Sequence, residues 1–203
     1  MAKLTENSFR DVNIAFANEL SIICDTLHIN VWELIKLSNR HPRVNILNPG
    51  PGVGGHCIAV DPWFIVSSDP ENAKIIRTAR EVNDGKPGYV IESVKKAADR
   101  FKAPVIACLG LSFKADIDDL RESPAVAIVE ALADQEVGEL LVVEPNVNML
   151  PKSLEGRVEK TDLNDALEKA DIMLLLVDHK EFKRMDRTLL NGKVAIDTRG
   201  TWK

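Results

Sequence analysis

The hydrophobic pattern of the chain changes its period near residue 100. From Pro104 onward, four short apolar runs rich in Val, Ile and Leu occur, namely VIACLGL, ELLVVE, DIMLLLV and KVAID. Helical patterns such as SPAVAIVEALADQ and LNDALEKA separate them. Short apolar runs that alternate with helical segments are typical of strands buried on both faces of a parallel sheet. This half of the chain is therefore predicted to be α/β, a parallel sheet with crossover helices.

The residues before this change follow a helical period. One long amphipathic helix with a single buried face is predicted from apolar residues at steps of three and four, namely Phe9, Val12, Phe16, Leu20, Ile23 and Leu27. Asn30 and Glu33 resemble a capping box, which predicts a second helix through VWELIKLS. Asp69 and Pro70 predict the start of a helix through ENAKIIRTAREVND, with a further helical segment through KPGYVIESVKKAADRF. We expect an all-helical region over residues 1–100 and an α/β domain over 101–203.

Composition narrows the class of protein. The net charge is -5, and Lys and Arg are scattered among Asp and Glu, so no basic stripe for nucleic acid is expected. No apolar run approaches the ~20 residues that span a bilayer, and MAKLTENSFR lacks the apolar core of a signal peptide, which predicts a cytoplasmic protein without a membrane partner. Three cysteines at wide spacing, Cys24, Cys57 and Cys108, favour neither a disulfide framework nor a zinc site.

The segment GPGVGGHCIAVDP contains the best candidate for chemistry. Its glycines match G-x-G-x-x-G, but RVNILNP before them is not a convincing strand, so a dinucleotide fingerprint is not expected. Glycines let backbone N–H groups approach a ligand and leave the side chain of Cys57 uncrowded, which suits a thiolate nucleophile. Cys24 and Cys108 lie among apolar neighbours and are predicted to be buried. An inert Cys57 stays an alternative, and a metal pair with His56 lacks further ligands, so no metal is expected.

A second group of polar residues follows the predicted strands. Lys114 and Arg121 lie in GLSFKADIDDLRESPA, before a helix that is predicted to begin near Ser123. Two cations beside a helix N-terminus are able to hold a phosphate or diphosphate. The alternative is that they are solvated loop charges that pair with the aspartates of the same segment, Asp116, Asp118 and Asp119. Arg199 follows the last strand, where ligand-facing loops of such sheets lie.

Five segments together resemble one family, in order and over essentially the whole chain. KLTENSFRDVNIAFANEL, NRHPRVN, GPGVGGHCIAVDPWF, GLSFKADIDDLRESPA and AIDTRGTW resemble the UDP-glucose/GDP-mannose dehydrogenase family, whose members oxidise a nucleotide-sugar alcohol to the carboxylate. His56 and Val60 stand where the UDP-glucose branch more typically has serine and lysine. They favour UDP-N-acetyl-D-mannosamine as substrate and its uronic acid as product, for bacterial surface polysaccharide.

The resemblance also implies an organisation. Family members begin with a dinucleotide-binding domain carrying G-x-G-x-x-G, which this chain lacks, so it resembles the C-terminal half. Residues 1–100 would then be the central dimerisation region, and residues 101–203 the Rossmann-like UDP-binding domain. The implied cofactor is NAD, bound mainly by the absent domain. The implied partners are a UDP-sugar and a second copy of the chain, joined through the first helix.

Residue roles are implied in the same way. Cys57 would be the nucleophile that forms a thiohemiacetal and then a thioester. Lys3 matches the catalytic lysine, Asn7 lies one helical turn later and would share the stabilisation of an oxyanion, and Asp61 would position the hydrolytic water. Arg121 would reach the NAD. The implied substrate contacts are Arg10, His41, Arg43, Gly54, Phe113, Lys114 and Arg199.

Two alternatives stay open at this point. A dehydrogenase for another sugar, such as UDP-glucose or UDP-N-acetylglucosamine, would share the mechanism. A non-catalytic module for nucleotide-sugar binding or dimerisation is the other alternative, although binding of UDP alone does not require Cys57, Lys3 and Asp61. Without the dinucleotide-binding domain, the chain is predicted to be inactive by itself.

Overall fold

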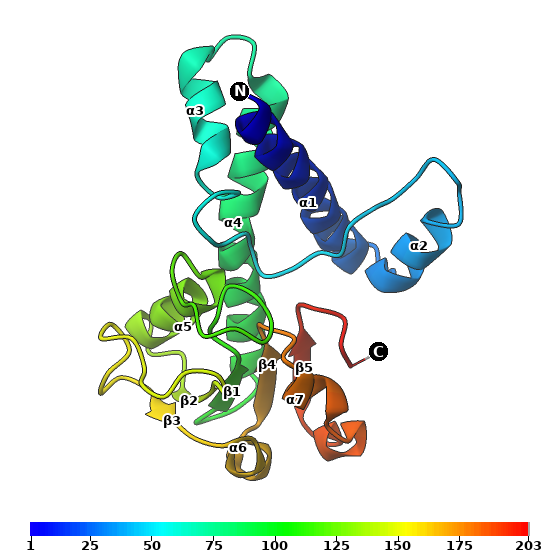
Figure 1. Cartoon of the computed structure of the whole chain (residues 1–203). Helices are drawn as coiled ribbons and strands as arrows, with labels where there is room; N and C mark the ends of the chain where they lie inside the picture. The colour runs from blue at the N-terminus through cyan, green and yellow to red at the C-terminus, as the bar shows by residue number, and fades with distance from the viewer. Residues whose placement is uncertain (203) are drawn as a thin grey trace. The chain divides into compact units, whose positions relative to one another are not determined.

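The computed structural model describes residues 1–202, and Figure 1 shows the chain. The chain divides into two compact units, the first from Met1 to Lys86 and the second from Pro87 onward. A helical region is followed by a five-stranded parallel sheet with helices, which confirms the predicted fold class. Among the described residues, no helix has the length and apolarity that crossing a membrane requires.

The first unit is helical. It contains α1 (Ala2–Thr26), α2 (Val31–Ser38), α3 (Asp61–Ser68) and the beginning of α4 (Lys74–Ala98). α1 packs against α3 and, at its other end, against α2 (Figure 1). The side chain of Asn30 accepts hydrogen bonds from the backbone N–H groups of Trp32 and Glu33, which confirms the predicted cap of α2.

The start of α4 differs from the prediction. Asp69 is the C-cap of α3, which the sequence did not predict, and its carboxylate accepts the Asn72 N–H at 3.2 Å instead of capping a helix. α4 therefore begins only at Lys74, and the prediction of a helix opening at Asp69 and Pro70 is wrong. The aspartate is used in a local turn because its side chain reaches a backbone donor three residues later. α4 then continues through Pro87 as one helix.

The face of α1 that lies against the rest of its unit is not the apolar one. The predicted stripe is largely exposed, at 69% for Phe9, 54% for Phe16 and 59% for Leu27. The buried face is made of small and polar residues, namely Ser8, Asp11, Ala15, Ala17, Asn18, Ser21 and Cys24. The expectation that the apolar stripe is buried within the chain is therefore wrong, whereas the helix itself is confirmed. Small side chains allow close approach between helices, and Asp11 and Asn18 find hydrogen-bond partners on α4.

The second unit contains the sheet, whose strands pair only in parallel, in the order β3-β2-β1-β4-β5. The strands are β1 (Val105–Leu109), β2 (Glu139–Val143), β3 (Glu159–Lys160), β4 (Ile172–Leu175) and β5 (Val194–Asp197). In the register of the central strands, Cys108 lies opposite Val142 and Leu174. The four predicted strands are confirmed, and only the two-residue edge strand β3 was not anticipated.

Each face of the sheet has its own apolar core. Alternate residues of β1 face opposite sides, with Ile106 and Cys108 in one core and Ala107 and Leu109 in the other. α5 (Pro124–Asp134) and the second half of α4 cover the first face. α6 (Leu163–Lys169) and α7 (Lys180–Arg184) supply apolar residues to the second, and a short 3-10 helix, η1 (Arg187–Leu190), precedes β5.

The end of α4 belongs to the second unit. The compact units divide between Lys86 and Pro87, within α4, whereas the sequence placed the boundary near residue 100. Val90, Val94 and Ala97 lie in the core on the first face of the sheet. The helical period of this segment does not indicate which core it joins. The prediction from the sequence therefore placed the whole helix in the first, helical region.

Candidate active site

The carboxylate of Asp61 is the centre of a polar cluster in the first unit. It lies in the first turn of α3 and its residue is only 7% exposed. Its Oδ2 accepts a hydrogen bond from Asn7 Nδ2 at 2.7 Å and lies 3.4 Å from Lys3 Nζ. Lys3 and Asn7 are four residues apart on α1, so they share one side of that helix. The structure thus brings two predicted residues of α1 together with Asp61, which lies more than 50 residues further along the sequence.

Cys57 joins this cluster from the turn that leads into α3. Its carbonyl accepts the Asp61 N–H at 2.8 Å, and its side chain is exposed. The pKa of Lys3 is raised above its ordinary value, first by the charge of Asp61 and next by that of Cys57. Lys3 therefore stays an ammonium at neutral pH, beside both a carboxylate and a thiol. Gly55, with φ at 85°, gives the turn before Cys57 a backbone conformation that other residues rarely adopt.

The other two cysteines are buried, as predicted. Burial raises the pKa of the Cys24 thiol, and it raises that of Cys108 to about 12. Both therefore stay protonated near neutral pH, where a nucleophile or a metal ligand needs a thiolate. Among residues 1–202, no group of three or more His, Cys, Asp and Glu side chains is arranged to hold a metal ion.

A buried polar network, which the sequence analysis missed, holds the start of the glycine-rich segment. Asn18 Oδ1 accepts the Gly50 N–H at 2.8 Å, and Asn18 Nδ2 donates to Asn83 Oδ1 at 2.9 Å. Asn83 Nδ2 donates to Asp11 Oδ1 at 2.8 Å, and Arg80 Nη1 donates to the same oxygen at 2.6 Å. The network fixes the segment that ends at the cluster to both α1 and α4. The sequence did contain a signal for this network, because polar residues recur at helical spacing in α1 and in α4.

Burial sets the electrostatics of this network. The pKa of Asp11 is raised by burial, although the charge of Arg80 and a hydrogen bond from Asn83 oppose the shift. The side chains of Arg80 and Asp11 are 1% and 0% exposed. Arg80 also forms an ion pair with Asp84, at the surface of the same helix. The guanidinium is therefore the main favourable partner that Asp11 has in the interior.

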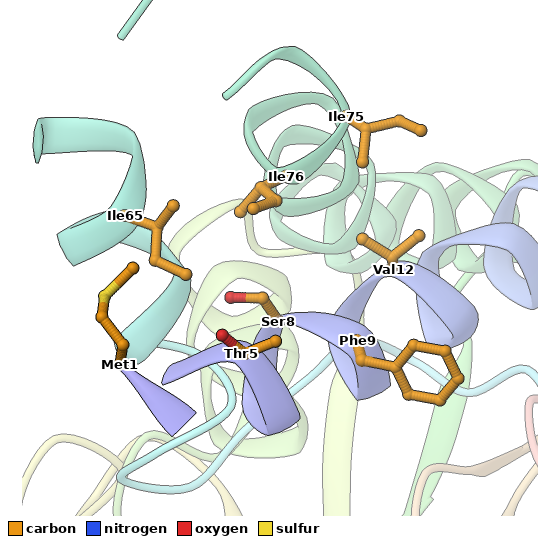
Figure 2. A pocket seen from close by; sticks show the side chains of 8 residues that line it. All are labelled: Met1, Thr5, Ser8, Phe9, Val12, Ile65, Ile75 and Ile76. Carbon is orange, nitrogen blue, oxygen red and sulfur yellow. The ribbon is translucent and has the colours of Figure 1, made fainter. Parts of the chain in front are cut away.

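An apolar pocket of about 420 Å³ lies beside the start of α1 (Figure 2). Residues of α1, α3 and α4 line it, namely Met1, Thr5, Ser8, Phe9, Val12, Ile65, Ile75 and Ile76. Its polar groups are hydroxyls, and Ser8 Oγ is buried without a hydrogen-bond partner among the described residues. A lining of this kind offers no charge to a diphosphate, so the polar cluster around Asp61 is the stronger candidate site.

The remaining predicted residues of the first unit lie on the surface. Arg10 is exposed on α1, and Gly54 is half-buried in the glycine-rich segment. His41 and Arg43 lie in the exposed loop after α2, where the Arg43 N–H donates to His41 Nδ1 at 3.2 Å. Within the described part of the chain, no hydrogen bond or ion pair links these four residues to the Asp61 cluster.

In the second unit, the predicted residues lie at the carboxyl ends of the strands. Phe113 and Lys114 follow β1, and the Lys114 carbonyl accepts a hydrogen bond from Ser112 Oγ at 2.7 Å. Arg199 follows β5, and its Nε lies 3.0 Å from Asp178 Oδ1, after β4. Although burial would raise the pKa of Asp178, a hydrogen bond from Lys183 and the charge of Arg199 lower it, so this carboxylate is ionised. In parallel sheets, ligands bind at this edge.

Arg121 lies in the same loop and is ion-paired. Its Nη2 lies 2.6 Å from Asp119 Oδ2, and its Nε donates to both oxygens of that carboxylate. The hydrogen bond and the charge of Asp119 raise the pKa of Arg121 further. The side chain is 70% exposed. Arg121 is therefore charged and accessible, but already neutralised by a neighbour in the loop.

The end of β1 does not fit the pyrophosphate of a dinucleotide. In dinucleotide-binding sheets, backbone N–H groups after the first strand hold the phosphates. Here the Leu111 and Ser112 N–H groups donate instead to Glu144 Oε2, at 2.7 and 3.1 Å. A buried carboxylate thus occupies these two donors. This edge therefore lacks two of the backbone donors that hold the pyrophosphate of a dinucleotide.

Comparison with known proteins agrees with this geometry. Residues 1–85 match the central domain of the UDP-glucose/GDP-mannose dehydrogenase family, and residues 107–203 match its UDP binding domain, which leaves only residues 86–106 unmatched. An NDP-N-acetyl-D-galactosaminuronic acid dehydrogenase from Ralstonia solanacearum is 67% identical over all of this chain and 48% of its own length. A UDP-N-acetyl-D-mannosamine dehydrogenase from Yersinia pestis is 61% identical, over 100% of this chain and 50% of its own.

Solved structures resemble the chain over its whole length. A UDP-N-acetyl-mannosamine dehydrogenase from S. aureus has a TM-score of 0.86 at 45% identity, and covers 100% of this chain and 48% of its own. A UDP-D-ManNAc dehydrogenase from Pyrococcus horikoshii has a TM-score of 0.87 at 36% identity, with the same coverage. The chain spans about half the length of the curated relatives it matches. Since both of its units match domains of one family, the chain belongs to the UDP-glucose/GDP-mannose dehydrogenase family.

Proposed function

We propose that the chain is the central and UDP-binding part of a cytoplasmic, NAD-dependent 6-dehydrogenase for UDP-N-acetyl-D-mannosamine. The product is UDP-N-acetyl-D-mannosaminuronic acid, a precursor of bacterial surface polysaccharide. The observation that carries this proposal is the meeting of Cys57, Lys3, Asn7 and Asp61 within a unit that matches the central domain of the family. The names of relatives at 59–61% identity support the choice of sugar.

Each member of the cluster has a chemical role in this proposal. The Cys57 thiolate attacks the C6 aldehyde, so that an S–C bond forms and the carbonyl oxygen takes a proton to give a thiohemiacetal. The Lys3 ammonium and the Asn7 amide stabilise the developing oxyanion. After oxidation to the thioester, water held by Asp61 attacks the same carbon and gives one proton to the Asp61 carboxylate. The C–S bond then breaks, the thiolate leaves, and the acid that forms loses its proton to solvent to give the carboxylate.

NAD supplies the acceptor for the two hydrides when it is bound to the complete protein. Glu144 occupies the backbone donors at the end of β1, so we place the larger part of the NAD site outside the described residues. Arg121 is the residue of this chain that we propose to reach the cofactor.

The chain alone should therefore produce no NADH. Absorbance at 340 nm is followed with UDP-N-acetyl-D-mannosamine and NAD at saturating concentrations, and the expected rate equals that of a Cys57→Ser control. Steady turnover above this control would contradict the placement of the NAD site.

UDP binding is assigned to the second unit. Phe113 and Lys114 follow β1 and Arg199 follows β5, at the edge where ligands bind in parallel sheets, and this unit matches the UDP binding domain. We propose that Lys114 and Arg199 contact the diphosphate and that Phe113 packs against the nucleotide. Arg10, His41, Arg43 and Gly54 are proposed to contact the sugar.

Calorimetric titration tests both halves of this proposal. UDP should bind the chain saturably, and UDP-N-acetyl-D-mannosamine should bind at least about threefold more tightly than UDP and UDP-glucose, because residues of the first unit contribute contacts to the sugar. Equal affinity for all three ligands would limit recognition to the second unit. Absence of any UDP binding would overturn the assignment of Phe113, Lys114 and Arg199.

A second sugar is favoured by one observation. The relative at 67% identity is named for N-acetyl-D-galactosaminuronic acid, which points to a nucleotide sugar of the N-acetylgalactosamine series. The same titration with UDP-N-acetylgalactosamine and UDP-N-acetylglucosamine distinguishes these substrates. Tighter binding of either than of the mannosamine sugar would replace the proposed substrate without changing the chemistry.

We also propose a homodimer through the apolar stripe of α1. A second copy of the chain would cover Phe9, Phe16, Ile23 and Leu27, which α1 exposes on one side. In this dimer, the loop that carries His41 and Arg43 is proposed to contact the substrate bound to the other copy. Within its own chain, no described hydrogen bond or ion pair joins this loop to the Asp61 cluster.

Phe16→Asp should convert this dimer to a monomer, because it introduces a charge at the centre of the stripe. Sedimentation velocity should show the wild type as a dimer and the variant as a monomer at the same micromolar concentration. Thr26→Asp, on the same helix outside the stripe, is the matched control and should stay dimeric. A monomeric wild type would contradict the proposal.

A further inference from the structure

A buried histidine and a buried glutamate lie side by side at the carboxyl edge of the sheet. Glu144 follows β2 and His179 follows β4, and their residues are 3% and 0% exposed. His179 Nε2 lies 3.1 Å from Glu144 Oε2. Neither residue has a role in the chemistry proposed above. A buried ionisable pair is expensive unless its hydrogen bonds are satisfied, so its partners indicate what it does.

The hydrogen bonds assign the tautomer of His179. The Asp116 backbone N–H donates to Nδ1 at 2.9 Å, and Asn146 Nδ2 lies 3.0 Å from the same nitrogen. A backbone N–H is only a donor, so Nδ1 must be the acceptor and carries no proton. The proton of the neutral ring then lies on Nε2, which donates it to Glu144. Ser112 Oγ, at 3.3 Å, completes the surroundings of this nitrogen.

These contacts hold both ends of one loop segment. At its beginning, Glu144 Oε2 accepts the Leu111 and Ser112 N–H groups, and at its end His179 Nδ1 accepts that of Asp116. Asp116 has a positive φ of 61°, which is uncommon for a residue other than glycine. Its carboxylate also accepts the Lys180 N–H at 3.0 Å, so a second bond keeps this end against α7. Phe113 and Lys114 lie between the two held ends.

We propose that Glu144 and His179 are positioning residues for the loop that binds the nucleotide, with His179 Nδ1 as the acceptor that sets the conformation at Asp116. The proposal rests on the function proposed above for Phe113 and Lys114. Neither residue touches the ligand. They act by fixing the backbone on which the ligand contacts are built, so that less order has to be gained when UDP binds.

Two substitutions separate the two ring nitrogens. In His179→Asn, the amide oxygen takes the place of Nδ1 and still accepts from Asp116, whereas Glu144 loses the donor that Nε2 supplied and keeps its backbone donors. In His179→Gln, the amide nitrogen takes the place of Nε2 and still donates to Glu144, whereas Asp116 loses its acceptor. The two variants are therefore matched, and each removes a different contact of His179.

The affinity for UDP is measured by calorimetry for the wild type and both variants. His179→Gln should raise the Kd about tenfold, which corresponds to the loss of one buried hydrogen bond, and His179→Asn should change it less than about threefold. Amide hydrogen exchange at residues 112–116 should rise in the glutamine variant only. Equal effects of both substitutions, or no effect of either, would overturn the proposal.

A second measurement needs no variant and no ligand. In the wild-type chain, the two ring ¹⁵N shifts of His179 at pH 7.5 should show an unprotonated Nδ1 and a protonated Nε2. A protonated Nδ1 would overturn the positioning role even if the variants failed to fold. If wild-type UDP binding were absent, the proposed function would fail, whereas hydrogen exchange and the ring shifts would still decide the role of His179.

Discussion

Iodoacetamide should alkylate Cys57 at least about a hundredfold faster than Cys24 or Cys108 in the folded chain at pH 8. Cys57 is exposed beside the Lys3 ammonium, whereas the other two thiols are buried. With the pKa of Cys108 raised to about 12, only about one molecule in 10⁴ carries its thiolate at this pH, and that thiolate is inaccessible to the reagent. Peptide mapping by mass spectrometry at timed intervals gives the three rates separately.

Two controls make the comparison specific to the folded state. In 8 M urea, the three rates should converge to within a few-fold, because burial and neighbouring charges are lost. In Cys57→Ser, Cys24 and Cys108 should stay protected as in the wild type. A folded chain in which Cys57 reacts no faster than the buried thiols would remove the physical support for a nucleophile and favour a non-catalytic nucleotide-sugar-binding module.

Replacement of Arg80 by methionine should lower the free energy of unfolding by about 3–5 kcal/mol at pH 7. The substitution keeps most of the volume of the side chain but leaves the Asp11 carboxylate buried without its cation. The same carboxylate accepts a hydrogen bond from Asn83, which accepts one from Asn18, so the substitution acts on the whole buried network. Urea unfolding followed by circular dichroism measures the change.

The pH dependence of the same variant identifies the cause. Burial raises the pKa of Asp11 in the folded chain above 3.8, so the folded state binds more protons than the unfolded state between 3.8 and the raised value. Stability therefore falls as the pH rises through this window. Without Arg80 the pKa rises further, so Arg80→Met should lose less stability at pH 5 than at pH 7. A loss independent of pH would point to packing instead.

Arg77→Met is the matched control for this experiment. Arg77 lies one turn earlier on α4, and its guanidinium donates to the Pro70 carbonyl at 3.2 Å near the surface. Its replacement should cost less than about 1 kcal/mol, as for most exposed polar contacts. Similar losses for both variants would contradict the role assigned to the buried pair.

Local signals predicted those elements whose causes are local. The cap of α2 was predictable because Asn30 acts on N–H groups two and three residues away. The strands were predictable because β1, β4 and all of β2 after Glu139 are apolar and lie between the two faces of the sheet. The start of α4 was mispredicted because the Asp69 carboxylate is able to cap a helix or to form a turn, and the sequence does not decide between the two.

The buried face of α1 could not be predicted in the same way. Periodicity identifies where the apolar residues gather, but burial within this chain follows the small and polar side, where Asn18 and Asp11 find partners on α4. Those partners lie more than 60 residues away. The sequence therefore shows that the helix has two distinct sides, and only the tertiary contacts show which of them the rest of the chain covers.

The candidate sites also combine features that the sequence shows with features that only the tertiary structure shows. The glycines before Cys57 and the spacing of Lys3 and Asn7 are visible in the sequence, whereas their convergence on Asp61 depends on the packing of α1 against α3. The pair of Glu144 and His179 gave no signal, because each residue follows a different strand and neither belongs to a motif. Its connection exists only because parallel strands end at one edge.

The Glu144 carboxylate, which accepts the N–H groups after β1, takes the place that a bound anion has in other parallel sheets. Glu144 is an anion that the chain carries with it, covalently attached and therefore at an effective concentration that dilution does not alter. Because Glu144 itself accepts these N–H groups, the loop after β1 is held without a bound cofactor. Glu144 therefore keeps these two backbone donors occupied whether or not a nucleotide is bound.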